Sequence, residues 1–364
     1  MKIAAVVAVA SVTWAAIAGA ADDPKLNQHR PQEEAIAAAP LPYREEQVNF
    51  DNPAAPGIRL AGILSIPPGA GPFPAIVVIP GTGKHDRDAA VAGHKIPLVI
   101  GDTLTRRGYA VLRYDKRGVA QSTGDYENAT TRDLTSDAAA AVAYLRSRSD
   151  VDGKKVGIVG HSQGATLGAL VAARNPNIAF VVMLAGYAIP GKVLVAEQIR
   201  RMAIADGQSP EAANQTFNLN RRVYDAIAVS RNQPDAEARV RKVLASTQPP
   251  PGEADSSLAI EFARIGYMRD ILAYDPRPEL GKVRVPVLFL CGSKDLVLPP
   301  DVNLPAVRKV LSHDRDVTVV ELPGLNHMFQ HSPTGSPKEW GTIDETLAPE
   351  VLSLISEWVD RHAR

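Results

Sequence analysis

The sequence KVGIVGHSQGATLGALVAA, residues 155–173, is the most informative part of this chain about its fold. Its first five residues form a mainly apolar run typical of a strand, and residues 165–173 have the composition of a helix. The pentapeptide GHSQG joins the two, with a glycine two positions either side of Ser162. A serine on such a tight strand-to-helix turn presents its hydroxyl outside the sheet edge, because the glycines leave room for the neighbouring backbone. We interpret the turn as a nucleophile elbow. A glycine-rich turn with an incidental serine is the alternative, which the flanking strand and helix disfavour.

Two later residues supply the partners that an elbow serine needs. A serine hydroxyl is a weak nucleophile near neutral pH and requires a base that is itself oriented by an acid. Asp295 follows the strand-like run 285–290, and His327 lies in the loop after the strand-like run 316–322. The order serine, acid, histidine is the one expected after an elbow, and each residue follows a strand's C-terminal end. We therefore expect Ser162, Asp295 and His327 to form a catalytic triad, although such an aspartate can also be a turn residue and such a histidine a loop residue.

Acyl transfer also needs hydrogen-bond donors for the oxygen that becomes negative in the tetrahedral intermediate. The backbone N–H of Gln163, directly after the serine, is the first candidate for this oxyanion hole. The second donor should come from the loop PGTG at residues 80–83, which follows the strand-like run 75–79. We place it at Thr82, with Gly83 as the rival.

We expect no cofactor and no metal. The sequence DRD at residues 86–88 favours a charge-paired loop over a cation site, because hard cations take more oxygen ligands than it offers. The sequence GTGK at 81–84 does not match a phosphate-binding loop. That motif requires glycine where the chain has Val78, and serine or threonine where it has His85.

These motifs resemble those of the serine α/β-hydrolases, and more narrowly of bacterial carboxylesterases with a Pro-Gly-Ser-Gly-like oxyanion loop followed by Asp-Arg-Asp. The resemblance extends from about residue 43 to the C-terminus and rests on PGTG (80–83), DRD (86–88), YDKRG (114–118), GHSQG (160–164), GSKD (292–295), LNH (325–327) and the closing stretches 334–337 and 348–350. Thr82 stands where these proteins usually have serine, which matters little for a backbone contact. Because some relatives are peptidases, the resemblance implies acyl hydrolysis more firmly than it implies ester over amide.

Strand-like and helical runs alternate from residue 43 onward, which indicates an α/β fold whose mainly parallel sheet carries helices on both faces. We expect eight strands, with antiparallel pairing confined to the start and an α/β-hydrolase core over 43–188 and 281–364. Residues 189–280 have helical periodicity, many charges and no convincing strand. We expect them to form a helical cap, inserted after the sixth strand, that covers Ser162 and shapes its pocket. An insertion that only stabilises the sheet edge is the alternative.

The N-terminal segment has the pattern of a signal peptide. Lys2 precedes an almost uninterrupted apolar run at 3–17, and residues 18–20 are small, as a signal peptidase requires. We expect cleavage near Ala20 or Ala21, a flexible linker over 22–42, and a periplasmic or secreted protein. A retained membrane anchor is the alternative, because the apolar run is close to the length that spans a bilayer.

Composition points to a soluble globule of ordinary type. Of the 364 residues, 45% are hydrophobic and 22% are charged, and the 40 basic side chains equal the 40 acidic ones in number. No net field therefore attracts nucleic acid or an anionic membrane surface. The single cysteine, Cys291, excludes an intrachain disulfide, and we expect an inert core thiol.

The sequence as a whole predicts an exported serine hydrolase that cleaves carboxylic esters of small molecules through an acyl-enzyme. Two other functions stay open: a peptidase or amidase with the same triad, and a catalytically silent protein of this fold that binds a partner. The oligomeric state and the acyl-chain length cannot be predicted from these residues.

Overall fold

A mixed sheet runs through the computed structural model of the chain, which describes residues 29–38, 40–313 and 316–363. Its strands are β1 (Arg44–Asp51), β2 (Arg59–Ile66), β3 (Phe73–Ile79), β4 (Ala110–Tyr114), β5 (Val151–His161), β6 (Val181–Leu184), β7 (Val287–Gly292) and β8 (Val317–Leu322). The order across the sheet is β1-β2-β4-β3-β5-β6-β7-β8. Only the β1–β2 and β2–β4 pairs are antiparallel. The predicted eight-stranded, mostly parallel sheet is confirmed, including its antiparallel start.

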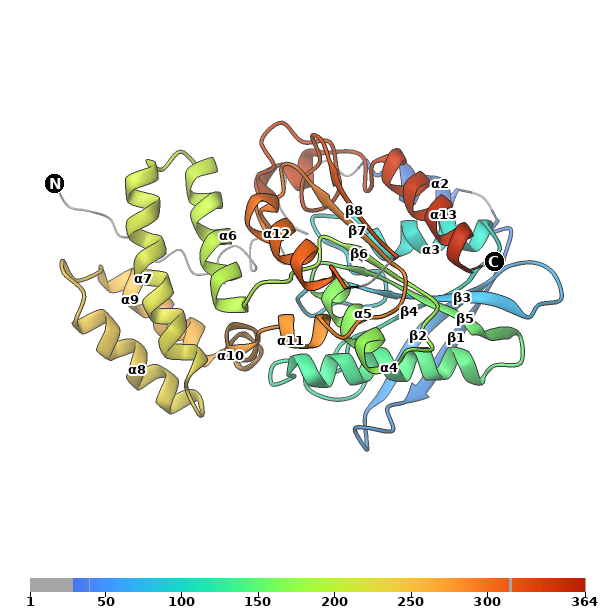
Figure 1. The fold of residues 1–364 in the computed structure, drawn as a ribbon, viewed down its shortest axis with the longest axis horizontal. Helices are drawn as coiled ribbons and strands as arrows, with labels where there is room; N and C mark the ends of the chain where they lie inside the picture. The colour runs from blue at the N-terminus through green and yellow to red at the C-terminus, as the bar shows by residue number, and fades with distance from the viewer. Residues whose placement is uncertain (1–28, 39, 314–315, 364) are drawn as a thin grey trace.

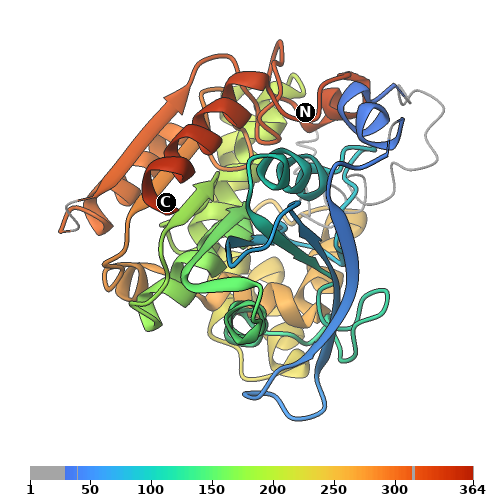
Figure 2. The same ribbon diagram turned by 90° about the vertical axis from the view of Figure 1, so that its right-hand side faces the viewer.

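Helices cover both faces of this sheet (Figures 1 and 2). Alternate residues of one strand pack to opposite sides: in β3, Val77 and Ile79 belong to one apolar core and Ile76 and Val78 to the other. The first core includes side chains of α4 (Thr131–Ser147), α5 (Gln163–Arg174) and α12 (Pro300–Val310), and the second those of α3 (Ile96–Arg106) and α13 (Pro349–Ala363). Because both faces are buried, β3, β6 and β7 are apolar throughout, as parallel strands usually are.

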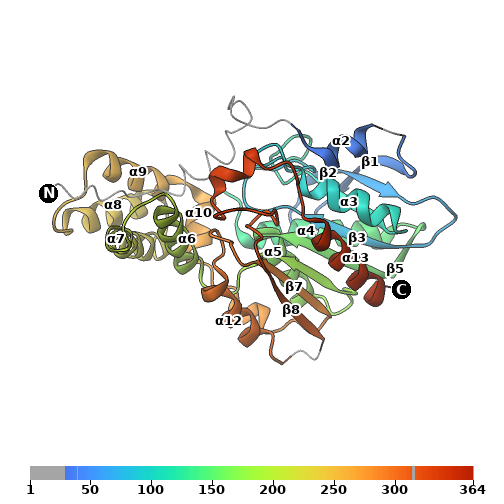
Figure 3. The ribbon, with the colours of Figure 1, turned by 90° about the horizontal axis from the view of Figure 1, so that it is seen from above.

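Six helices lie between β6 and β7: α6 (Gly191–Ala205), α7 (Pro210–Ala228), α8 (Gln233–Ala245), α9 (Glu253–Arg264), α10 (Gly266–Ala273) and α11 (Arg277–Leu280). Side chains of α6 to α10 form an apolar cluster of their own. In Figures 1 and 3, α7, α8 and α9 lie away from the sheet, while α10 lies closer to it. Asp270 of α10 accepts hydrogen bonds from the backbone N–H and the hydroxyl of Thr131, both at 2.6 Å, which ties this helical region to α4.

The N-terminal region departs from the prediction. The prediction of a flexible linker over residues 22–42, with order beginning near residue 43, is wrong for residues 31–37. These residues form helix α2 (Pro31–Ala37). Polar contacts with remote segments hold it. The buried Arg30 donates to the carbonyl oxygens of Ala92 and Gly341, and Glu33 accepts from the Thr346 hydroxyl at 2.6 Å. Contacts of this kind leave no periodic pattern in a sequence, so the helix could not be predicted from one.

The predicted signal peptide, residues 1–21, lies outside the described residues. Within the described ranges, no helix is long and apolar enough to cross a bilayer. Cys291 lies inside β7, and burial raises the pKa of its thiol to about 12, which fits the predicted inert core thiol.

Candidate active site

Ser162 is the single residue between β5 and α5, and its backbone is strained. Its φ of 55° and ψ of −121° lie in a region that residues other than glycine rarely adopt. The flanking glycines are required by close backbone contacts: a Cβ on Gly160 would lie 2.3 Å from the Gly164 carbonyl oxygen, and one on Gly164 would lie 2.2 Å from that of Ile79. The sequence pattern GxSxG therefore corresponds to a sharp turn that presents a strained serine.

Asp295 and His327 are hydrogen-bonded to each other. Asp295 Oδ2 lies 2.8 Å from His327 Nδ1, and both residues are buried. The other carboxylate oxygen, Oδ1, accepts from the backbone N–H groups of Val297 at 2.8 Å and Leu298 at 2.7 Å. These two donors fix the plane of the carboxylate. With Nδ1–H donating to Asp295, the imidazole keeps Nε2 as its proton acceptor.

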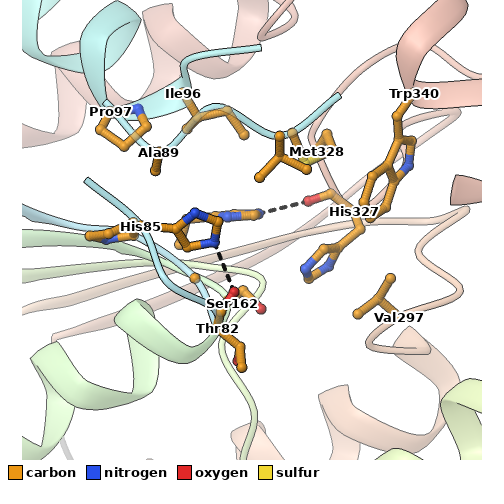
Figure 4. Close-up of a pocket in the computed structure, with 14 residues that line it drawn as sticks. Thr82, His85, Ala89, Ile96, Pro97, Ser162, Val297, His327, Met328 and Trp340 are labelled. Carbon is orange, nitrogen blue, oxygen red and sulfur yellow. Dashed lines mark hydrogen bonds between the residues drawn. The ribbon is translucent and has the colours of Figure 1, made fainter. Parts of the chain in front are cut away.

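Ser162 and His327 line the same cavity, which has a volume of about 40 Å³. Figure 4 shows the His327 ring extending toward the side on which Ser162 lies, between Val297 and Met328. Among the residues that the structure describes, none forms a hydrogen bond with the Ser162 hydroxyl. In unliganded active sites the bond between nucleophile and base is often long and tightens only with substrate. The structure thus brings all three predicted residues together, with the serine and histidine facing one cavity.

The two candidate oxyanion donors also lie beside Ser162. Gln163 is the first residue of α5, so its N–H has no acceptor within the helix. In the 80–83 loop, the Gly83 N–H donates to the Tyr126 hydroxyl at 2.7 Å, whereas no described residue accepts from the Thr82 N–H. Gly83 is therefore engaged elsewhere. Between the two candidates from this loop, the hydrogen bonding favours Thr82.

Lys116, in the YDKRG segment, supports this loop. Its ammonium donates to the Gly81 carbonyl oxygen and lies 3.4 Å from Gln163 Oε1. The side chain is buried, with Nζ 5.3 Å from the centre of the Tyr126 ring. Burial lowers the pKa of Lys116 to about 7.

Charged side chains of the DRD segment form ion pairs with residues outside the segment rather than with one another. Arg87 makes a bidentate contact with Asp115, at 2.9 and 2.6 Å, and Asp88 pairs with the buried Arg113. Across the described residues, no group of three or more His, Cys, Asp or Glu side chains is placed to hold a metal ion. Both carboxylate–guanidinium pairs hold the loop after β3 against the end of β4.

Two further histidines line the first cavity and are held neutral. His161 Nε2 lies 2.9 Å from the His327 carbonyl oxygen, and burial, with the neighbouring His327, lowers the pKa of His161 to about 3. His85 Nε2 lies 2.8 Å from the Thr82 carbonyl oxygen, and burial, with the charge of Lys116, lowers its pKa to about 4. A neutral ring that faces a carbonyl oxygen must donate from that nitrogen. Both histidines therefore support backbone of the site.

A second cavity, of about 30 Å³, adjoins the first, and Thr82, Ser162 and Val297 line both. Its remaining wall includes Gln163 and Tyr187 from the sheet side, Leu194, Val195 and Gln198 from α6, and Met268 and Ile271 from α10. Helical periodicity marks an apolar face but does not say what it covers, so sequence reasoning did not single out these wall residues.

Known proteins resemble the chain in sequence and in fold. A family model described as the alpha/beta hydrolase fold matches residues 74–333. Esterase EstD of Thermotoga maritima is 28% identical over 305 residues, which cover 82% of this chain but only 65% of EstD, slightly less than two thirds. The Pyrococcus furiosus esterase Pf2001 superimposes with a TM-score of 0.56 at 15% identity, over 89% of this chain and 93% of that one. Est1E of Butyrivibrio proteoclasticus, solved with ferulic acid bound, gives a TM-score of 0.52 at 19% identity, over 86% and 96%.

Proposed function

The chain belongs to the α/β-hydrolase family, and we propose that it is a serine carboxylesterase acting through a covalent acyl-enzyme. The observation that carries the proposal is the strained Ser162 in one cavity with His327, whose Nδ1 is bonded to the buried Asp295. The similarity to EstD, an esterase by name, supports the reaction class. A partner-binding protein with a silent site would have no need of this arrangement.

In the proposed mechanism, His327 Nε2 takes the proton from the Ser162 hydroxyl as the serine oxygen attacks the ester carbonyl. The N–H groups of Thr82 and Gln163 donate to the oxygen that becomes negative. Asp295 keeps the imidazole in the required tautomer and stabilises the imidazolium. His327 then protonates the departing alcohol, and water activated by the same histidine releases the acid.

The walls of both cavities support a neutral substrate over a charged peptide. An aminopeptidase needs a carboxylate near the nucleophile to hold the substrate's free amine, because a buried ammonium must be paired. No aspartate or glutamate, among the described residues, lines either cavity. Ester cleavage is therefore the preferred form of the activity.

The proposal is tested by Ser162→Ala, with Ser149→Ala, an exposed serine outside the site, as the matched control. Ser162→Ala should abolish turnover of p-nitrophenyl acetate and labelling by a fluorophosphonate, while Ser149→Ala retains both. Persistent labelling of Ser162→Ala would show that the nucleophile is another residue. Aminoacyl anilides, assayed in parallel, should be cleaved far more slowly than the esters.

We also propose export, which rests on the sequence of residues 1–21 alone. Expression of the full chain in a bacterium, followed by fractionation and mass measurement, tests it. The expected product is a periplasmic or secreted protein that begins near Ala21 or Asp22. A full-length protein in the membrane fraction would favour the retained anchor instead.

A further inference from the structure

Gln198 places an unpaired hydrogen-bond donor in the wall of the second cavity. The side chain belongs to α6, is only 3% exposed, and its Nε2 has no hydrogen-bond partner among the described residues. A buried amide donor without an acceptor is costly, so proteins rarely keep one unless something else satisfies it. The rest of the wall that α6 and α10 contribute is apolar: Leu194, Val195, Met268 and Ile271. Gln198 is thus the one polar side chain that these two helices add to this cavity.

Four other described residues of the cap helices also carry buried polar atoms without a hydrogen-bond partner: Arg201 of α6, and Asn220, Arg221 and Tyr224 of α7. None of the four lines either cavity beside Ser162. Gln198 differs from them because its side chain adjoins the space next to the nucleophile, where a substrate can supply the acceptor.

The position of His327 indicates which part of an ester occupies the second cavity. Because His327 protonates the leaving alcohol, the alcohol must lie on the histidine's side of Ser162. His327 lines the first cavity and not the second. The acyl part therefore lies in the second cavity, under α6 and α10, beside the Gln163 N–H.

We propose that Gln198 is a specificity residue that donates a hydrogen bond to an oxygen on the acyl chain of the substrate. The favoured substrates are then esters of short acids that carry an ether or carbonyl oxygen in the chain, and plain alkanoyl esters of equal length are poorer. This inference rests on the proposed esterase activity. The small volume of the cavity, about 30 Å³, restricts the chain to a few carbon atoms.

Three p-nitrophenyl esters of matched length test the proposal: the pentanoate, the 3-methoxypropanoate and the 4-oxopentanoate. Each kcat/KM is divided by the ester's rate of hydroxide hydrolysis, which removes differences in intrinsic reactivity. The wild-type protein should prefer at least one oxygen-bearing ester over the pentanoate by about tenfold, the usual effect of one hydrogen bond in a buried site. In Gln198→Leu that preference should disappear, mainly through KM, while the pentanoate is cleaved at least as well as before.

Gln215→Leu is the matched control, because Gln215 is an exposed glutamine on the neighbouring α7, and it should leave all three rates unchanged. Gln198→Met, which preserves the length of the side chain, must behave as Gln198→Leu does. Equal preference in the wild type and both Gln198 variants would overturn the inference while leaving the esterase activity intact. No turnover of any of the three esters by the wild type would instead refute the proposed function itself.

Discussion

The Lys116 ammonium donates a hydrogen bond to the Gly81 carbonyl oxygen, and that carbonyl belongs to the same peptide group as the Thr82 N–H. A cation bound to one end of a peptide group polarises it and makes the N–H at the other end a stronger donor. If Thr82 holds the oxyanion, Lys116 strengthens the oxyanion hole without touching the substrate. Lys116 is therefore a positioning residue. It is unusual because it is buried and because neither of its polar contacts, with Gly81 and with Gln163, is to a carboxylate.

Lys116→Met should therefore lower kcat with little change in KM. Loss of a direct oxyanion donor costs on the order of 10²–10³ in rate, so we expect a smaller effect, about tenfold, from a residue that acts through one. Kinetics with p-nitrophenyl acetate measure both constants. Lys282→Met, at an exposed site, is the control. A rise in KM of about tenfold with an unchanged kcat would mean that Lys116 only shapes the binding site.

The same lysine gives the activity a second dependence on pH. Because burial lowers the pKa of Lys116 to about 7, the ammonium is lost as the pH rises through that value, and the polarisation ends with it. The ratio of the wild-type kcat to that of Lys116→Met should thus fall toward one between about pH 6 and pH 8.5. Taking the ratio cancels every dependence on pH that the two proteins share. A ratio that stays constant over this range would contradict the assignment.

Asp295→Asn should reduce kcat by about 10⁴, the scale seen when such an aspartate is changed in a serine protease, without unfolding the protein. The backbone N–H groups of Val297 and Leu298 would hold the amide oxygen of the new side chain, so its NH₂ would face His327 Nδ1. Nδ1 must then accept, which puts the ring proton on Nε2 and removes the base. Turnover of p-nitrophenyl acetate measures the loss, and an unchanged melting temperature separates it from unfolding. A loss of less than tenfold would mean that another group orients His327.

The fold and the positions of Ser162, Asp295 and His327 could be predicted because local sequence patterns determine them. A Cβ on Gly160 would overlap the Gly164 carbonyl oxygen, and a Cβ on Gly164 would overlap that of Ile79. The turn therefore requires the two glycines of GHSQG, and the motif predicts the turn. Asp295 and His327 follow strands, and strand order brings the ends of neighbouring strands together.

The remainder of the site depends on contacts between distant segments, which a single sequence does not reveal. Trp340 reaches the first cavity from the short helical segment at Pro337–Thr342, and Gln198 reaches the second from α6. Neither lies in a motif. The choice of Thr82 over Gly83 likewise depends on Tyr126, more than forty residues later in the chain. Helix α2 was missed because Arg30 and Glu33 hold it with hydrogen bonds rather than with an apolar face.

Tyr126→Phe should lower kcat by about tenfold. The buried Tyr126 hydroxyl accepts from the Gly83 N–H at 2.7 Å and so holds the loop that carries Thr82. Without it, the Gly83 N–H is left unpaired and the loop moves to satisfy it, which displaces the adjacent donor from the oxyanion position. Steady-state kinetics test this change against Tyr144→Phe, a half-buried tyrosine on α4. Equal activity of the two variants would show that the loop keeps its position without this bond.

His94 should make the folded state sensitive to acid. It is fully buried, with Nδ1 2.9 Å from the Thr346 hydroxyl and Nε2 2.8 Å from the Trp340 carbonyl oxygen, and burial lowers its pKa to about 4. The unfolded chain binds a proton at this histidine below about pH 6.5, whereas the folded protein does not until about pH 4. The free energy of unfolding must therefore fall as the pH decreases through that window.

His94→Gln removes this proton and tests the prediction. The variant should be less stable than the wild type at pH 7, because it loses a hydrogen bond to either Thr346 or Trp340. Its free energy of unfolding should then fall less steeply as the pH decreases. For one proton, the slopes of the two proteins differ by up to about 1.4 kcal/mol per pH unit. The difference in stability between them should therefore narrow toward pH 4.5. Urea unfolding at pH 7, 6, 5 and 4.5 measures the difference at each point. A constant difference would mean that His94 binds its proton with the same pKa in the folded protein as in the unfolded chain, which its burial opposes.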